Sequence, residues 1–197
     1  MYPDSLKKVV DSFKLFPGIG ERTAERLAFS VLNMENENVE NIAKNLINLQ
    51  KNIKQCKTCN VLTDEDTCNI CSNTLRDSTT LCIVDDSKSV FLFEKMGIYN
   101  GLYHVLDGLI SPIDGVTPDD IGLDKLINRI KEGNFKEIVL AVKPSVEGET
   151  TSLYIKRILE DMNIKISKIA SGIPMGADIE YLDVLTLERA LKDRTTL

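Results

Sequence analysis

The sequence predicts a multi-domain α/β protein built from three unlike regions and a short C-terminal segment, residues 171–197. In residues 1–54, apolar side chains recur every three or four positions, which is the period of amphipathic helices. Residues 55–75 hold four cysteines but few large apolar side chains, so contacts outside this segment must stabilise it. Over residues 79–170, short apolar runs alternate with helical patterns, which is typical of a mainly parallel sheet covered by helices.

Composition limits the classes of protein to which this chain can belong. Its 197 residues are 43% hydrophobic, which is sufficient for one large core or several small ones. The sequence has no leading apolar run with a basic flank and no apolar run of about 18 residues, so we expect neither a signal peptide nor a membrane span. Five cysteines without a secretory signal favour a reducing cytoplasm.

Charge is distributed unevenly along the chain. The net charge of −6 argues against a generally basic surface for nucleic acid. The first 55 residues are nevertheless slightly basic, whereas the remainder is acidic. Any surface that binds DNA is therefore expected in the N-terminal third.

Three helices are expected in residues 1–54. The apolar faces of the first two are formed by Leu6, Val9, Val10, Phe13, Ala24, Leu27, Ala28 and Val31. The third is expected over residues 39–53, with Ile42, Leu46 and Ile53 on its apolar face.

The α/β region is expected to contain four strands and three helices. The predicted strands are 81–84, 101–106, 137–142 and 164–170. The predicted helices are 87–97, closed by Gly97, then 118–133 and 148–161.

The cysteine-rich segment has the spacing of a structural zinc site. "CKTCNVLTDEDTCNIC" reads C-x2-C-x8-C-x2-C, with its ligands at Cys56, Cys59, Cys68 and Cys71. Each C-x2-C turn directs two thiolates at one ion, and two such turns complete the tetrahedron that Zn²⁺ prefers. Two disulfides are the alternative. With four protein ligands the zinc would stabilise the segment and perform no chemistry. The fifth cysteine, Cys82, lies in an apolar strand and is expected to be buried.

A glycine-containing turn separates the first two helices. "FPGIGERTAERLAF" places Gly18 and Gly20 where backbone N–H groups stay uncovered beside a helix N-terminus, so they can bind a phosphate without reading a base. Arg22 and Arg26 lie four residues apart, on one helical face. The stretch resembles the helix-hairpin-helix motif of DNA repair proteins; an ordinary helical hairpin is the alternative. Lys7, Lys8 and Lys14 are further candidates for the basic patch, with ordinary solvated lysines on a helix as the alternative.

Acidic residues follow two predicted strands and resemble, in outline, the magnesium site of Toprim domains in topoisomerases and primases. Asp85 ends the first strand, and "KPSVEGE", residues 143–149, resembles the "DPDREGE" form of that site. On this alignment Lys143 and Ser145 replace both aspartates of the D-x-D pair, whereas the glutamates of the motif remain.

These replacements predict weak magnesium binding. Two ligand charges are lost and a cation is added where the metal would lie, although Glu147 and Glu149 remain. We hypothesise that Lys143 pairs with Asp85 or Glu147 instead. The single histidine, His104, lies within a strand and is expected to form structural hydrogen bonds, so no nucleophile–base pair is indicated.

Five stretches together resemble the RecR family of bacterial recombination mediators. They are "FPGIGERTAERLAF" (16–29), the cysteine quartet (56–71), "YHVLDGLISPIDGV" (103–116), "KPSVEGET" (143–150) and "GIPMGADIEYLDVLTLERAL" (172–191). The order of helix-hairpin-helix, four-cysteine zinc finger and Toprim-like domain covers nearly the whole chain. Asp85 departs from the usual glutamate of the family, and Lys143 from its usual asparagine.

The resemblance implies a DNA clamp without catalytic activity. Members of the family bind double- and single-stranded DNA, form dimers and ring-like tetramers, and act with RecO and RecF to load recombinase onto strands coated by SSB. The family's DNA contacts match Arg22 and Arg26, and its partner-binding acidic position matches Glu147, with Asp85 as a second candidate. The C-terminal segment is expected to contribute to oligomerisation, because the sequence has no P-loop that would bind ATP.

Two other classes of function stay open at this point. One is a magnesium-dependent Toprim enzyme, such as a nuclease or a primase. The other is a zinc-stabilised adaptor that binds only proteins.

Overall fold

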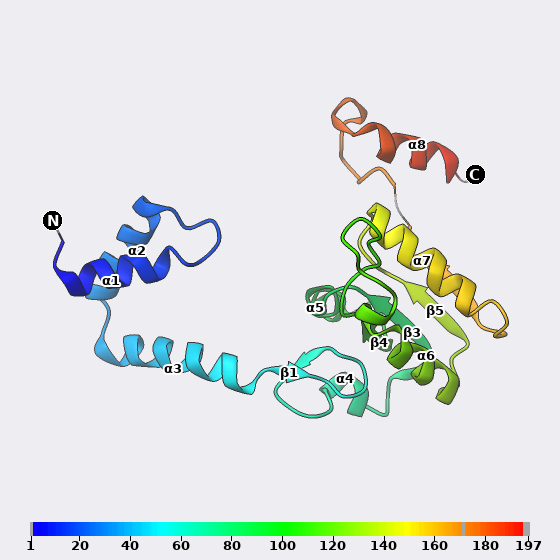
Figure 1. Ribbon diagram of the computed structural model, residues 1–197, viewed down its shortest axis with the longest axis horizontal. Helices are drawn as coiled ribbons and strands as arrows, with labels where there is room; N and C mark the ends of the chain where they lie inside the picture. Colours follow the sequence, from blue (N-terminus) through cyan, green and yellow to red (C-terminus); the bar gives the residue numbers. More distant parts are fainter. Residues whose placement is uncertain (1, 171, 195–197) are drawn as a thin grey trace. The chain divides into compact units, whose positions relative to one another are not determined.

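The computed structural model describes residues 2–170 and 172–194 and divides the chain into two compact units, Met1–Ile53 and Lys54–Leu197. The first unit is helical and the second contains the sheet (Figure 1). Among the described residues, no helix is long and apolar enough to cross a membrane.

The helical unit consists of α1 (Asp4–Phe13), α2 (Glu21–Leu32) and α3 (Asn36–Asn52). As predicted, α1 and α2 pack through the expected apolar positions, with Val10, Ala24 and Ala28 buried at their contact and Leu6, Val9, Phe13 and Ile19 packed around them. The third helix begins three residues before its predicted start. None of its described side chains is buried, and Ile42 and Leu46 are 47% and 54% exposed. The predicted apolar face therefore exists but is exposed in the part of the chain that the structure describes.

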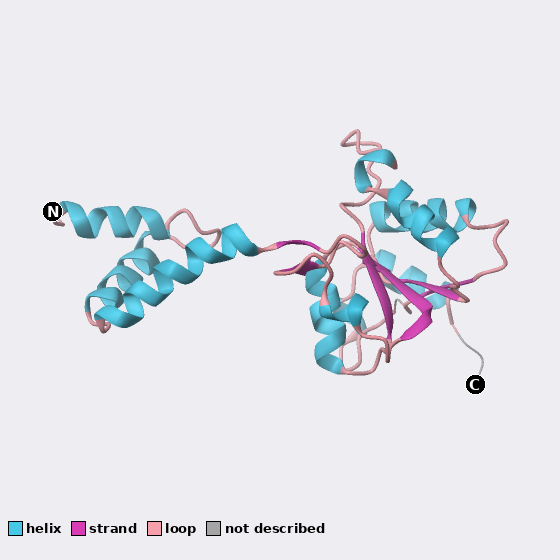
Figure 2. Ribbon diagram, turned by 90° about the horizontal axis from the view of Figure 1, so that it is seen from below, coloured by secondary structure: helices cyan, strands magenta, loops and turns pink. Residues whose placement is uncertain are grey.

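The second unit contains a four-stranded parallel sheet in the order β4-β3-β5-β6, which confirms the predicted α/β class. Figure 2 shows the strands in magenta with helices around them. Its elements are β3 (Asp77–Val84), α5 (Ser87–Met96), β4 (Gly101–Val105), a 3-10 turn (Asp119–Ile121), α6 (Leu123–Glu132), β5 (Glu137–Leu140), α7 (Val146–Ile158) and β6 (Lys165–Lys168).

Successive side chains of β3 point to opposite faces of the sheet and so belong to two different hydrophobic cores. Leu81 and Ile83 face the larger core, which α6 and α7 cover. Cys82 and Val84 face the other side, where α5 and the cysteine-rich segment pack. Each face of the sheet is therefore covered, as a parallel sheet requires.

Two predicted helices have different limits in the structure. The helix expected over 118–133 is broken at Gly122, which adopts a left-handed φ of 69° and separates the 3-10 turn from α6. The helix expected over 148–161 begins at Val146, because Ser145 caps it by accepting a hydrogen bond from the Gly148 amide. This earlier start brings Glu147 into the first turn of α7.

The remaining elements are short. The cysteine-rich segment contains β1 (Lys54–Gln55), β2 (Leu62–Thr63) and α4 (Asn69–Ser72), and β1 pairs antiparallel with β2. The C-terminal segment contains a 3-10 turn (Ile179–Tyr181) and α8 (Val184–Lys192).

Candidate functional site

The four predicted zinc ligands converge in the structure. The Sγ atoms of Cys56, Cys59, Cys68 and Cys71 all lie within 4.8 Å of one another. The Sγ atoms of Cys59 and Cys68 are 3.5 Å apart, which is far longer than the roughly 2.05 Å of a disulfide bond. All five cysteines are free thiols, so the disulfide alternative is not supported. Four sulfurs around one point match the tetrahedral site of structural zinc, and the predicted cofactor is confirmed.

Backbone and side-chain contacts attach the zinc finger to the edge of the sheet. The Val105 amide donates to the Cys59 carbonyl over 2.8 Å, and Asn60 Nδ2 donates to the Val105 carbonyl over 3.0 Å. Cys56 and Cys59 are fully buried in the same apolar cluster as Tyr103. The segment thus relies on the core of the sheet domain, as its lack of large apolar residues predicted.

Cys82 and His104 are structural groups. Cys82 is buried as predicted, outside the ligand set, and burial raises the pKa of its thiol to about 12. His104 is fully buried, with Arg129 Nη1 3.3 Å from its Nδ1. Burial first, and then the charges of Arg129 and Lys125, lower the pKa of His104 to about 3. The ring is therefore neutral at physiological pH and inaccessible to a substrate, which argues against a role as a general base.

The turn between α1 and α2 exposes its backbone. The Ile19 amide donates to the Phe16 carbonyl over 3.1 Å, and Gly18 has a φ of 81°, as the third residue of a type II turn requires. Gly20 precedes α2 as its N-cap and offers no side chain to the first amides of the helix. A Cβ atom built on Gly18 or Gly20 would meet nothing within 4 Å. The N–H groups at the start of α2 are therefore open to an anion, whereas the Ile19 amide is already engaged by the Phe16 carbonyl.

Ion pairs on α2 leave its two arginines available. Within the described residues, Arg22 and Arg26 form no ion pair, and both are exposed. Glu21 is 2.5 Å from Lys14 Nζ, whereas Glu25 accepts a hydrogen bond from Tyr2. The two glutamates of α2 are thus engaged elsewhere.

Lys14 is a weaker contributor to a basic patch than the sequence suggested. Its ammonium group lies between Glu21 and Asp11, at 2.5 and 3.7 Å. The pKa of Lys14 is raised, first by its hydrogen bond to Glu21. Its charge is therefore balanced within the unit. The cations that form no ion pair among the described residues include Arg22 and Arg26 on α2 and the exposed Lys7 and Lys8 on α1.

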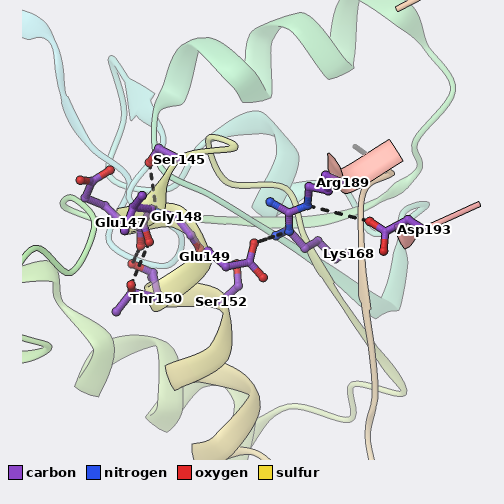
Figure 3. A network of polar contacts seen from close by, with 11 residues as sticks. Ser145, Glu147, Gly148, Glu149, Thr150, Ser152, Lys168, Arg189 and Asp193 are labelled. Carbon is purple, nitrogen blue, oxygen red and sulfur yellow. Dashed lines mark hydrogen bonds and ion pairs between the residues drawn. The ribbon is translucent and has the colours of Figure 1, made fainter. Parts of the chain in front are cut away.

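The first turn of α7 holds the Toprim-like segment (Figure 3). Gly148 lies so close to the loop after β5 that an added Cβ atom would be 1.9 Å from the Lys143 carbonyl oxygen, so only glycine fits there. Glu147 accepts a hydrogen bond from Ser145, and this bond, more than the charge of Lys143, lowers the pKa of Glu147. Lys143 is exposed and forms no ion pair with Glu147 or with Asp85, so the hypothesis of a direct pair was wrong.

Glu149 points away from Glu147, toward the C-terminal segment (Figure 3). It forms ion pairs with Lys168 on β6 and with Arg189 on α8, and Arg189 Nη2 lies at 2.5 Å. Arg189 first, and then Lys168, lower the pKa of Glu149. Sequence reasoning missed both partners, because they lie 19 and 40 residues away along the chain.

The acidic residues of this edge do not gather into a metal site. Among the described residues, the cysteine quartet is the only group of three or more candidate ligands close enough to share one ion. Asp85, Glu147 and Glu149 therefore do not form a cluster of three carboxylates around one point.

A magnesium titration of the zinc-loaded protein should show no saturable one-site binding by isothermal calorimetry. The double variant Lys143→Asp/Ser145→Asp restores two carboxylates and is expected to gain affinity for Mg²⁺ by about ten-fold or more. Stoichiometric, tight binding by the unmodified chain would contradict this geometry.

Glu149→Gln should loosen α8 while leaving the sheet intact. In the unmodified protein, the pKa of Glu149 is lowered, so its ion pair with Arg189 on α8 is complete at pH values above the ordinary pKa of a carboxyl group. This stabilising ion pair is lost as the pH falls through the lowered pKa of Glu149. Partly exposed pairs contribute about 1 kcal/mol or less, so the expected change is local. Hydrogen exchange of residues 184–192 measures it, at neutral and acidic pH.

The matched control for this variant is Glu188→Gln, whose ion pair with Lys192 lies within α8. Exchange in α8 should rise more in the Glu149 variant than in the Glu188 variant at neutral pH. Equal rates in both variants would show that the bridge to Arg189 does not hold the helix.

Regions that match known protein families cover nearly the entire chain. Family models match in chain order: RecR helix-hairpin-helix (residues 6–49), RecR four-cysteine zinc finger domain (53–73), Toprim domain (79–170) and RecR C-terminal (172–195). Similar curated proteins are named recombination protein RecR, from Streptococcus pyogenes serotypes M49 (strain NZ131), M3 (strain SSI-1) and M1. Each is 47% identical over 197 residues, covering 100% of both chains. Full-length similarity at this level, together with three domain models specific to RecR, shows that the chain belongs to the RecR family of recombination proteins.

Proposed function

We propose that this protein is a non-enzymatic DNA clamp that mediates recombination in the cytoplasm. In this role it acts with RecO and RecF to load recombinase onto single-stranded DNA coated by SSB. Membership of a family of recombination proteins supports the general role. The arrangement of the α1–α2 turn supports the mode of DNA binding.

The observation that carries the proposal is a helix N-terminus without a side-chain cap, followed by two arginines that form no ion pair within the described residues. The amides at the start of α2, after Gly20, have no side-chain acceptor, and a Cβ atom built on Gly20 would meet nothing within 4 Å. A phosphate there would gain backbone hydrogen bonds, the helix dipole and the charges of Arg22 and Arg26. None of these groups reads a base, so binding would be independent of sequence and sensitive to salt.

The acidic edge of the sheet suits a protein partner better than DNA. Glu147 and Asp85 are both partly exposed, and the lowered pKa of Glu147 keeps its carboxylate ionised. Negative charge repels the DNA backbone and attracts a basic protein surface. We assign this edge to RecO.

Self-association would account for the exposed apolar face of α3. Ile42 and Leu46 are exposed, and the helical unit buries only a small cluster of its described side chains. A second copy could cover this face, as dimers and ring-like tetramers require. A ring retains DNA by encircling it, which is compatible with a net charge of −6.

DNA binding with and without Mg²⁺ tests the proposal. Labelled duplex and single-stranded oligonucleotides should be retained at low salt, released as salt rises, and recovered intact. Cleavage or synthesis that depends on Mg²⁺ would favour a Toprim enzyme instead. Absence of retention at low salt would favour an adaptor that binds only proteins.

A further inference from the structure

Two apolar side chains are exposed at the α1–α2 turn. Leu15 is 84% and Phe16 50% exposed, although both belong to a unit with a small core. The turn is not loose. The Leu15 and Phe16 amides donate to the Ser12 and Phe13 carbonyls, each over 3.2 Å, and Ile19 packs against the core on the other side of the turn. The Phe16 ring is therefore presented from a fixed backbone.

The surroundings of this ring favour an anionic ligand. Phe16 lies at the start of the same turn whose later residues expose N–H groups, and Arg22 follows in the first turn of α2. The neighbouring acids, Asp11 and Glu21, are both paired with Lys14. An exposed aromatic ring in the turn that leads to the open amides of α2 and to Arg22 offers a stacking surface only a few residues from groups that can bind phosphate, a combination that nucleic acids need.

We propose that Phe16 stacks on an unpaired nucleobase, with Leu15 alongside, so that the turn recognises single-stranded DNA and the ends of duplexes where a strand separates. The inference rests on the proposed DNA-binding function and adds a preference among DNA structures. Phosphate contacts by the turn and by Arg22 serve single and double strands alike. Stacking by Phe16 requires a base face that is free, and paired bases within a duplex cover theirs.

The substitution Phe16→Ala in the full-length, zinc-loaded protein tests this assignment. Loss of one aromatic–base stack should weaken binding of a single-stranded oligonucleotide by about ten-fold, whereas binding of a blunt duplex should change by less than about two-fold. Fluorescence anisotropy at one fixed salt concentration measures both. Leu32→Ala is the matched control, since Leu32 is a similarly exposed apolar residue at the far end of α2.

A second variant reports the stack directly. The chain has no tryptophan, so Phe16→Trp introduces a single indole at the turn. This variant should retain its affinity for the single strand. Its tryptophan emission should be quenched when a single strand binds, and much less when a blunt duplex of the same length binds.

The outcomes separate the two proposals. Equal losses of single-strand and duplex binding in Phe16→Ala, or no quenching of the indole by a single strand, would overturn the stacking assignment. A changed oligomer size by analytical ultracentrifugation would also overturn it, since Phe16 would then be a subunit contact. If Arg22→Ala/Arg26→Ala leaves both kinds of DNA bound, the proposed DNA-binding function itself fails, independently of Phe16.

Discussion

Replacing Cys59 with serine is expected to abolish stoichiometric zinc binding and to unfold residues 55–75. Cys59 is fully buried, and its carbonyl accepts the hydrogen bond that attaches β4 to the finger. Zinc contributes on the order of 10 kcal/mol to the folding of small Cys-rich modules, and this segment has few large apolar residues to replace it. The damage should extend to β4, because the finger and that strand share one apolar cluster.

Zinc content by mass spectrometry and thermal unfolding measure this loss. Cys82→Ala is the control, since Cys82 is buried in the same cluster but lies outside the ligand set. The control should bind one zinc ion per chain and lose only about 1–2 kcal/mol of stability from the smaller side chain. A Cys59→Ser protein that binds one equivalent of zinc and melts at the same temperature as the unmodified chain would refute the site.

Local patterns explain which features were predictable from the sequence. The zinc ligands follow from spacings within a stretch of 16 residues, so no knowledge of the tertiary fold was needed. Alternation of strands and helices was sufficient for a parallel sheet, because parallel strands need crossover helices. The apolar period of α1 and α2 likewise identified the residues that pack, including Val10 and Ala24.

Features that depend on distant contacts could not be predicted. Glu149 was read as a remaining metal ligand, but its direction is decided by Lys168 and Arg189, which only the fold brings near. Lys14 was a candidate for the basic patch, and its pairing with Glu21 could not be foreseen because it crosses the turn between two helices. In each case the sequence gives the charge of the side chain, whereas its ion-pair partner is known only from the tertiary structure.

The double substitution Arg22→Ala/Arg26→Ala should weaken DNA binding, on single and double strands alike. Both side chains are exposed and without ion pairs in the described residues, so each can neutralise one phosphate. Each lost phosphate contact on duplex DNA should reduce the slope of log affinity against log salt by about 0.9, hence by about 1.8 for the pair. Affinity at low salt should fall by about ten-fold or more, and the difference should narrow as salt rises.

A change in net charge alone could imitate this result, so the control must remove the same charge elsewhere. Lys156→Ala/Arg157→Ala does so, because both residues are exposed on the last turn of α7, in the other unit of the chain. If long-range attraction dominates, both double variants should lose affinity equally. If the turn binds the phosphates, only the α2 variant should lose both affinity and salt slope, since counterions are released at the contact itself. Unchanged binding by the α2 variant would remove the turn from the DNA-binding surface.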